Sequence, residues 1–164
     1  MQPFWKIDTM QLQSDDKIYL LDDNMFYINI FEQHLVNLGY KDISIFDSPA
    51  DCSNKLDPPP NIIFYDHSVN FLNDLEVLKM IKRQHPDIYL VFMCGPDNVA
   101  PVIQSLKFGV FDYFVKGDRD AKNIELILTK IQRVRELLDK HNLGRVKKTS
   151  SVNAKGELKF FPNI

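Results

Sequence analysis

Four polar positions follow short apolar segments of this sequence, and together they could carry out phosphoryl chemistry. Asp22 and Asp23 follow residues 17–21, Asp66 follows residues 61–65, and Lys116 follows residues 111–115. Three carboxylates held close together repel one another, so a cation would be needed to neutralise them. Hard oxygen ligands favour Mg²⁺, and a carboxylate between Mg²⁺ and an ammonium group is well placed to attack a phosphoryl group.

The apolar pattern predicts five strands that alternate with five helices. Continuous apolar runs predict strands at 17–21, 43–46, 61–65, 88–93 and 111–115. Helical spacing predicts helices from Met25 to near Gly39, over 49–56, from Leu75 to before Pro86, from Val99 to near Gly109, and from Ile124 to Leu138. Short connections between these elements predict an α/β fold, with a doubly wound parallel sheet between two layers of helices.

A parallel sheet brings the carboxyl ends of its strands to one edge, where α/β proteins bind ligands. The acidic residues, Cys94 and Lys116 would therefore meet there. Asp22 and Asp23 alone could cap a helix, and Asp66 could be a turn residue. Several such positions at one edge favour a functional site instead.

Residues 20–24, 62–66, 91–95 and 112–116 resemble the motifs of the receiver domain of two-component response regulators. The resemblance covers about residues 16–140 and implies the flavodoxin-like strand order 2-1-3-4-5. It implies that Asp66 accepts a phosphoryl group and, with Asp23, binds Mg²⁺ directly. Asp22 would act through metal-bound water, and the backbone carbonyl of Ser68 would complete the protein's ligands.

The same resemblance gives roles to two further residues and shows two departures. Lys116 would hold the phosphoryl group, and Tyr113 occupies the aromatic position that moves inward on activation. Cys94 stands where the family usually has Ser or Thr, and a thiol is a weaker hydrogen-bond donor, so we expect phosphorylation with reduced coupling to Tyr113. Gly117 replaces the usual proline, so a cis proline bond cannot be assumed there and a more mobile loop is expected.

Composition and charge limit the organisation of the chain. With 45% hydrophobic residues and a formal charge of −2, its 164 residues fit one globular domain. We expect an N-terminal extension at 1–15, the receiver domain at 16–141 and a basic C-terminal tail at 142–164. Nucleic acid is not an expected partner, no membrane span is expected, and the lack of a signal-peptide pattern predicts a cytoplasmic protein.

The resemblance implies bacterial-type signalling with protein partners rather than a conventional enzyme. A histidine kinase or phosphotransfer protein would supply the phosphoryl group, and a downstream protein would be the effector. The only chemistry expected of the chain itself is self-phosphorylation and dephosphorylation at Asp66. Ile127, Ile131, Val134 and Leu138 follow a 4-3-4 spacing that fits a homodimer through the last helix or a helix end exposed to water. A receiver-like scaffold independent of phosphorylation is the alternative, and a flavodoxin-like nucleotide-binding domain is disfavoured because no glycine-rich loop follows the first predicted strand.

Overall fold

The computed structural model describes residues 15–67, 71–149, 151–152 and 158–159. The chain forms two compact units that divide between Leu128 and Thr129. No helix within the described ranges is long and apolar enough to cross a membrane.

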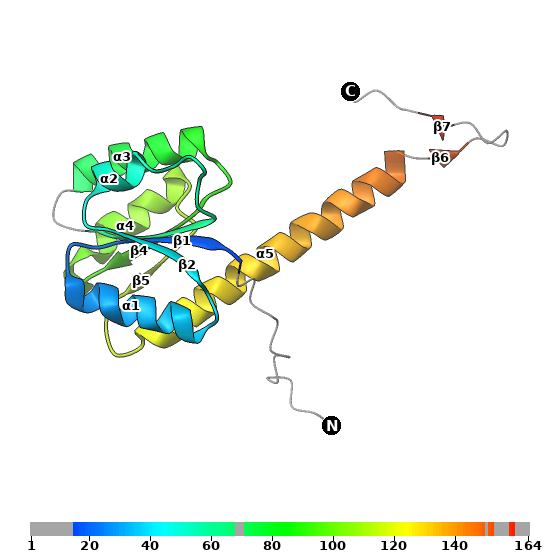
Figure 1. Cartoon of the computed structure of the whole chain (residues 1–164). Coiled ribbons are helices and arrows are strands. Elements are labelled where there is room, and N and C mark those ends of the chain that lie inside the picture. The colour runs from blue at the N-terminus through cyan, green and yellow to red at the C-terminus, as the bar shows by residue number, and fades with distance from the viewer. Residues whose placement is uncertain (1–14, 68–70, 150, 153–157, 160–164) are drawn as a thin grey trace. The chain divides into compact units, whose positions relative to one another are not determined.

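The first unit is built on a five-stranded parallel sheet (Figure 1). Its strands are β1 (Lys17–Leu21), β2 (Asp42–Phe46), β3 (Ile62–Asp66), β4 (Tyr89–Cys94) and β5 (Asp112–Val115). Their order is β2-β1-β3-β4-β5, as expected. The central strands β1, β3 and β4 are almost wholly buried, which explains why they are continuous apolar runs in the sequence.

Helices cover both faces of this sheet and make the expected three layers. They are α1 (Met25–Asn37), α2 (Pro49–Ser53), α3 (Phe71–Gln84), α4 (Val99–Ser105) and α5 (Asp120–Thr149). In Figure 1, α1 and the first part of α5 lie on one face, and α2, α3 and α4 lie on the other. Short 3₁₀ segments, Pro96–Asn98 and Leu106–Phe108, flank α4.

Local side-chain chemistry sets the start and end of α1. The side chain of Asn24 accepts a hydrogen bond from the backbone N–H of Phe26 at 3.0 Å, so Asn24 is the N-cap. Asp22 and Asp23 therefore do not cap this helix. Gly39, with φ of 96°, follows the helix in a left-handed conformation that suits glycine.

Several element boundaries differ from the sequence-based expectation. The helix expected over 49–56 ends at Ser53, where the N–H of Asn54 bonds the carbonyl of Ala50 and the chain turns toward the prolines at 58–60. Asp66 is the last residue of β3 rather than the residue after it. These shifts of a few residues leave the order of the elements unchanged.

The last helix is longer than the sequence pattern indicated. α5 continues to Thr149, so the boundary drawn at residue 142 from composition lies inside a helix. Residues 142–149 contain Leu, Arg, Val and Lys and no proline, and most of these residue types are compatible with continued helix. In the second unit, β6 (Ser151–Val152) pairs antiparallel with β7 (Leu158–Lys159).

Candidate functional site

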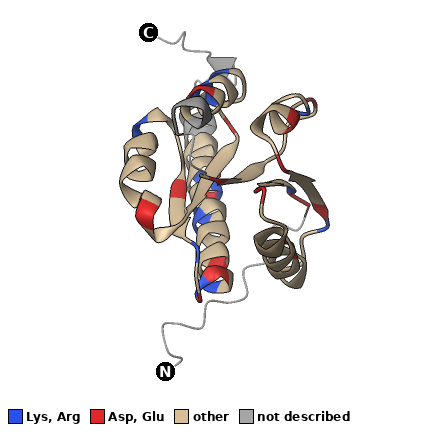
Figure 2. Cartoon of the chain, turned by 90° about the vertical axis from the view of Figure 1, so that its left-hand side faces the viewer, with Lys and Arg blue, Asp and Glu red and all other residues tan. Residues whose placement is uncertain are grey.

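The carboxyl edge of the sheet collects the residues that the sequence singled out. Asp22 and Asp23 lie between β1 and α1, Asp66 ends β3, Cys94 ends β4, and Lys116 directly follows β5. Figure 2 faces this edge and shows acidic positions, in red, at the ends of strands. Backbone bonds prolong the strand ladder into the loops: the N–H of Asp22 bonds the carbonyl of Phe46, and the N–H of Lys116 bonds that of Cys94.

The three aspartates form one acidic cluster. One carboxylate oxygen from each of Asp22, Asp23 and Asp66 lies within 4.8 Å of the others. Asp22 is buried, Asp66 is partly buried and Asp23 is exposed. The Asp22 side chain also accepts a 2.8 Å hydrogen bond from the N–H of Asn24, which fixes its orientation.

Lys116 is the counter-charge of this cluster. Its Nζ lies 2.9 Å from Asp22 Oδ2 and 2.6 Å from Asp66 Oδ1, and its side chain is only 9% exposed. Burial by itself lowers the pKa of Lys116, but the hydrogen bonds to Asp66 and Asp22 and their charges outweigh it and raise that pKa. The ammonium group is therefore charged and directed at the acids.

The surroundings of Asp66 shift its pKa in opposite directions. Burial raises the pKa of its carboxyl group, the hydrogen bond and charge of Lys116 lower it, and Asp22 and Asp23 raise it again. The net direction is upward. When all three acids are ionised, the cluster with Lys116 carries an excess of two negative charges.

The donor set fits a magnesium ion. All three side chains offer hard carboxylate oxygens, their spacing allows them to share one ion, and a divalent cation would cancel the excess negative charge. Asp23 and Asp66 would hold the ion directly, and Asp22 would act through metal-bound water. The expected contribution of the Ser68 carbonyl lies outside the described residues.

Cys94 is placed at the site, but its thiol faces a neighbouring strand. Its Sγ donates a 3.7 Å hydrogen bond to the carbonyl of Phe114 in β5, and the side chain is fully buried. Burial and the charge of Asp66 raise the pKa of this thiol, so it stays protonated. Tyr113 is partly buried and packs against the core cluster that includes Cys94.

The loop after Lys116 uses the N–H that a proline would lack. Gly117 donates a 2.8 Å hydrogen bond to the side chain of Asp120, at the start of α5. The peptide bond between Lys116 and Gly117 is trans, because the cis bond found among the described residues is Asp57–Pro58. The trans bond agrees with the expectation that a cis bond cannot be assumed where glycine replaces proline.

No protein-family model matches the chain. Nitrogen assimilation regulatory protein NtrX of Azorhizobium caulinodans is 28% identical over 101 residues, which are 60% of this chain and 22% of NtrX. Luminescence regulatory protein LuxO of Vibrio campbellii is 24% identical over 98 residues, or 59% and 21% of the two chains. The match thus covers about a fifth of the length of these relatives.

Solved structures give the same assignment of fold. A CheY-like response regulator receiver domain protein from Methanospirillum hungatei has a TM-score of 0.64 and 19% identity, over 74% of this chain and 97% of that chain. NtrX from Brucella abortus has a TM-score of 0.65 and 22% identity, over 76% and 29%. This chain has the CheY-like receiver fold, and its relatives by sequence are response regulators.

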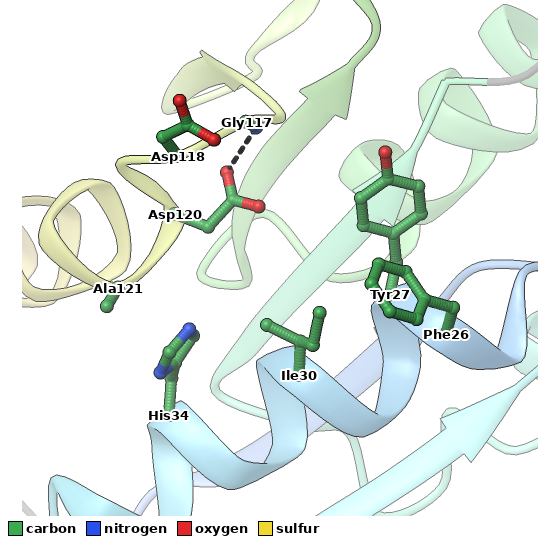
Figure 3. Close-up of a pocket in the computed structure, with 8 residues that line it drawn as sticks. All are labelled: Phe26, Tyr27, Ile30, His34, Gly117, Asp118, Asp120 and Ala121. Atoms are coloured by element: carbon green, nitrogen blue, oxygen red, sulfur yellow. Dashed lines mark hydrogen bonds between the residues drawn. The ribbon is translucent and has the colours of Figure 1, made fainter.

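Beside the acidic cluster, the receiver has a groove of about 370 Å³ between α1 and the start of α5 (Figure 3). Its walls are Phe26, Tyr27, Ile30 and His34 from α1, and Gly117, Asp118, Asp120 and Ala121 from the other side. Three apolar or aromatic side chains and His34 of α1 thus line one side of the groove, and two aspartates contribute to the other. The sequence pattern did not single out this surface.

Two residues of the receiver site were missed by reasoning from sequence. Tyr27 places its ring 4.3 Å from Lys116 Nζ, and Asp120 anchors the loop that carries Lys116. Tyr27 is one of several aromatic residues near the start of α1, and nothing in the one-dimensional pattern separates it from core residues. Asp120, three residues after Gly117 and ahead of an apolar helix, does carry the signal of an acidic helix start.

Proposed function

We propose that this receiver accepts a phosphoryl group on Asp66 in a Mg²⁺-dependent reaction and signals through contacts with other proteins. The observation that carries the proposal is the 2.6 Å contact between Asp66 and Lys116 within a cluster of three carboxylates. Partly buried Asp66 is the nucleophile, because its neighbours can balance the charge that develops on a transferring phosphoryl group.

The reaction needs a phosphoryl donor, these side chains and Mg²⁺. An Asp66 carboxylate oxygen forms a bond to phosphorus while the bond from phosphorus to the donor's leaving atom breaks. Lys116 Nζ, already 2.6 Å from Asp66 Oδ1, stabilises negative charge on the phosphoryl oxygens. Asp23, Asp66 and the Ser68 carbonyl would hold Mg²⁺ directly and Asp22 would hold it through metal-bound water, and the ion would supply further charge neutralisation.

Intact-mass spectrometry tests this proposal. The chain is incubated with acetyl phosphate and MgCl₂, beside the Asp66→Asn variant and a sample containing EDTA. We expect one added phosphoryl group in the wild type with Mg²⁺, and none in the variant or in EDTA. A gain that survives Asp66→Asn overturns the site assignment. No gain in any sample favours the phosphorylation-independent scaffold.

The switch from phosphorylation to signalling is proposed to be weak in this chain. A Ser or Thr hydroxyl at position 94 could donate to a phosphoryl oxygen, whereas the Cys94 thiol is a weak donor and bonds the Phe114 carbonyl. Backbone NMR shifts of Tyr113 and residues 94–98, measured before and after phosphorylation, should be smaller in the wild type than in Cys94→Thr. Equal shifts in the two proteins would refute this part of the proposal.

The partners are proposed to be proteins of a cytoplasmic signalling pathway. We propose that a histidine kinase or phosphotransfer protein approaches Asp66 past the first turn of α1, where Met25 and Phe26 are 61% and 66% exposed. The phosphorylated receiver would then bind a downstream effector protein. These apolar side chains offer contact area that a small donor such as acetyl phosphate does not need.

A homodimer through the last helix is a separate proposal for the second unit. Leu137 and Leu138 of α5 are 61% and 53% exposed. Light scattering across a concentration series, with and without acetyl phosphate, measures the oligomeric state. A mass that stays monomeric under both conditions would exclude the dimer.

A further inference from the structure

An aromatic ring covers the ammonium group of Lys116. The Tyr27 ring centroid lies 4.3 Å from Lys116 Nζ, within the range in which a cation is attracted to the face of an aromatic ring. The same Nζ contacts the carboxylates of Asp22 and Asp66. The ammonium group is thus enclosed by two acids and one ring, and this enclosure accounts for its low exposure.

Packing fixes the position of that ring. Tyr27 stacks on Phe31 with centroids 6.0 Å apart and an interplanar angle of 19°, and Phe26 meets it edge-on at 5.6 Å. Phe31 in turn contacts Phe114 of β5 edge-on at 6.0 Å. Because Lys116 follows β5, this aromatic chain ties the ring to the strand that carries the lysine.

A lysine needs such support more than an arginine would. Its ammonium group is a compact charge on a flexible four-carbon stem and has no rigid fork that fixes its direction. The carboxylates of Asp22 and Asp66 attract Lys116 Nζ, and the ring of Tyr27 makes a further contact with the same ammonium group. Tyr27 also lines the groove between α1 and the start of α5 (Figure 3).

We propose that Tyr27 is a positioning residue for Lys116: its ring holds the ammonium group toward Asp66 and so increases affinity for a phosphoryl group at that site. The inference rests on the proposed phosphoryl chemistry of Asp66. The ring face, rather than the hydroxyl group, makes the contact. Tyr27→Phe should therefore keep the effect, and Tyr27→Leu should remove it.

The first measurement tests the geometry without using any activity. A ring over Nζ shifts the NMR signals of the neighbouring Lys116 Hε protons upfield. We expect this shift in the wild type and in Tyr27→Phe, and its loss in Tyr27→Leu. The matched control is Tyr89→Leu. Tyr89 begins β4 and its ring contacts that of Phe111, so this variant loses an aromatic ring elsewhere and should keep the shift. A wild type without the shift, or a shift that survives Tyr27→Leu, overturns the proposal.

The second measurement tests the consequence with a phosphoryl analogue. Beryllofluoride is titrated into each protein in the presence of Mg²⁺. The affinity of Tyr27→Phe and Tyr89→Leu should stay within twofold of the wild type, while Tyr27→Leu should bind about 3- to 30-fold more weakly. Wild-type affinity in Tyr27→Leu overturns the positioning role even if the NMR shift is as expected.

The two measurements separate this inference from the proposed function. If the wild type binds no beryllofluoride and accepts no phosphoryl group, the proposed function fails and the positioning role fails with it, although the ring contact can still be observed. If the wild type binds and is phosphorylated, only the variants at Tyr27 decide. A circular dichroism melt of each variant shows that the fold is retained.

Discussion

Replacing Asp23 by Asn should stabilise the protein without Mg²⁺ and destabilise it, relative to the wild type, with Mg²⁺. Asp23 is the exposed member of the acidic cluster, within 4.8 Å of two other carboxylates. The ion pairs of Lys116 are made with Asp22 and Asp66. The substitution therefore removes repulsion while these two ion pairs remain.

The size of the effect follows from Coulomb's law. Two unit charges 4.8 Å apart, the limit for the oxygens of this cluster, repel by about 0.9 kcal/mol in water and by about 3.5 kcal/mol at an effective dielectric constant of 20. Because Asp23 is exposed, the lower value applies, and two partners give a gain of about 1–2 kcal/mol for Asp23→Asn in EDTA. In the wild type, Mg²⁺ at a hundred times its dissociation constant would add about 2.7 kcal/mol, which the variant should largely lose.

Urea denaturation in EDTA and in MgCl₂ measures both effects. The free energies of unfolding of the two proteins should cross: the variant is more stable in EDTA and the wild type is more stable in MgCl₂. Asp42→Asn, an exposed acid at the start of β2 and hence at the opposite edge of the sheet, is the control and should change neither value by more than about 0.5 kcal/mol. A variant less stable than the wild type in EDTA, or one that gains as much from Mg²⁺, would refute the reasoning.

Three further predictions concern other parts of the receiver. Burial raises the pKa of Asp120 above its ordinary 3.8, so the stability that this group contributes is complete below pH 3.8 and is lost as the pH rises through the folded pKa. In urea titrations, the free energy of unfolding of Asp120→Asn should equal that of the wild type near pH 3.8 and exceed it at pH 7. A difference that does not change with pH would contradict this prediction. Gly109→Ala should lower the free energy of unfolding by about 1–2 kcal/mol, because φ is 96° and an added Cβ would lie 3.1 Å from Lys82 Cε, whereas Gly117→Ala, with open space around it, should be nearly neutral. Met25→Ser, at a side chain that is 61% exposed, should slow phosphoryl transfer from a phosphotransfer protein about tenfold but leave transfer from acetyl phosphate unchanged, and equal slowing with both donors would count against a docking role.

Much of the fold and the site could be predicted because the apolar pattern of neighbouring residues in the sequence indicates the strands and the polar residues that follow them. Buried strands such as β3 are continuous apolar runs, and parallel topology then places Asp22, Asp66 and Lys116 at one edge without further information. The same pattern could not show that Asn24, rather than the aspartates before it, caps α1, because several capping residues stand in a row.

What the sequence could not show depends on contacts between distant residues. The ring of Tyr27 meets a lysine 89 positions later in the chain, and no periodicity links the two. The direction of the Cys94 thiol likewise follows from the position of the Phe114 carbonyl in the neighbouring strand. The end of α5 was missed because the boundary was drawn from a change in charge, and basic residues are compatible with continued helix.

The central claim is that Asp66 is the phosphoacceptor, and locating the phosphoryl group on the chain tests it most directly. After incubation with acetyl phosphate and MgCl₂, borohydride reduction converts a phosphorylated aspartate to homoserine, and mass spectrometry of the peptides identifies the position. We expect homoserine at position 66, dependent on Mg²⁺. Homoserine at Asp22 or Asp23, or an unmodified position 66 in a chain that has gained a phosphoryl group, would contradict it.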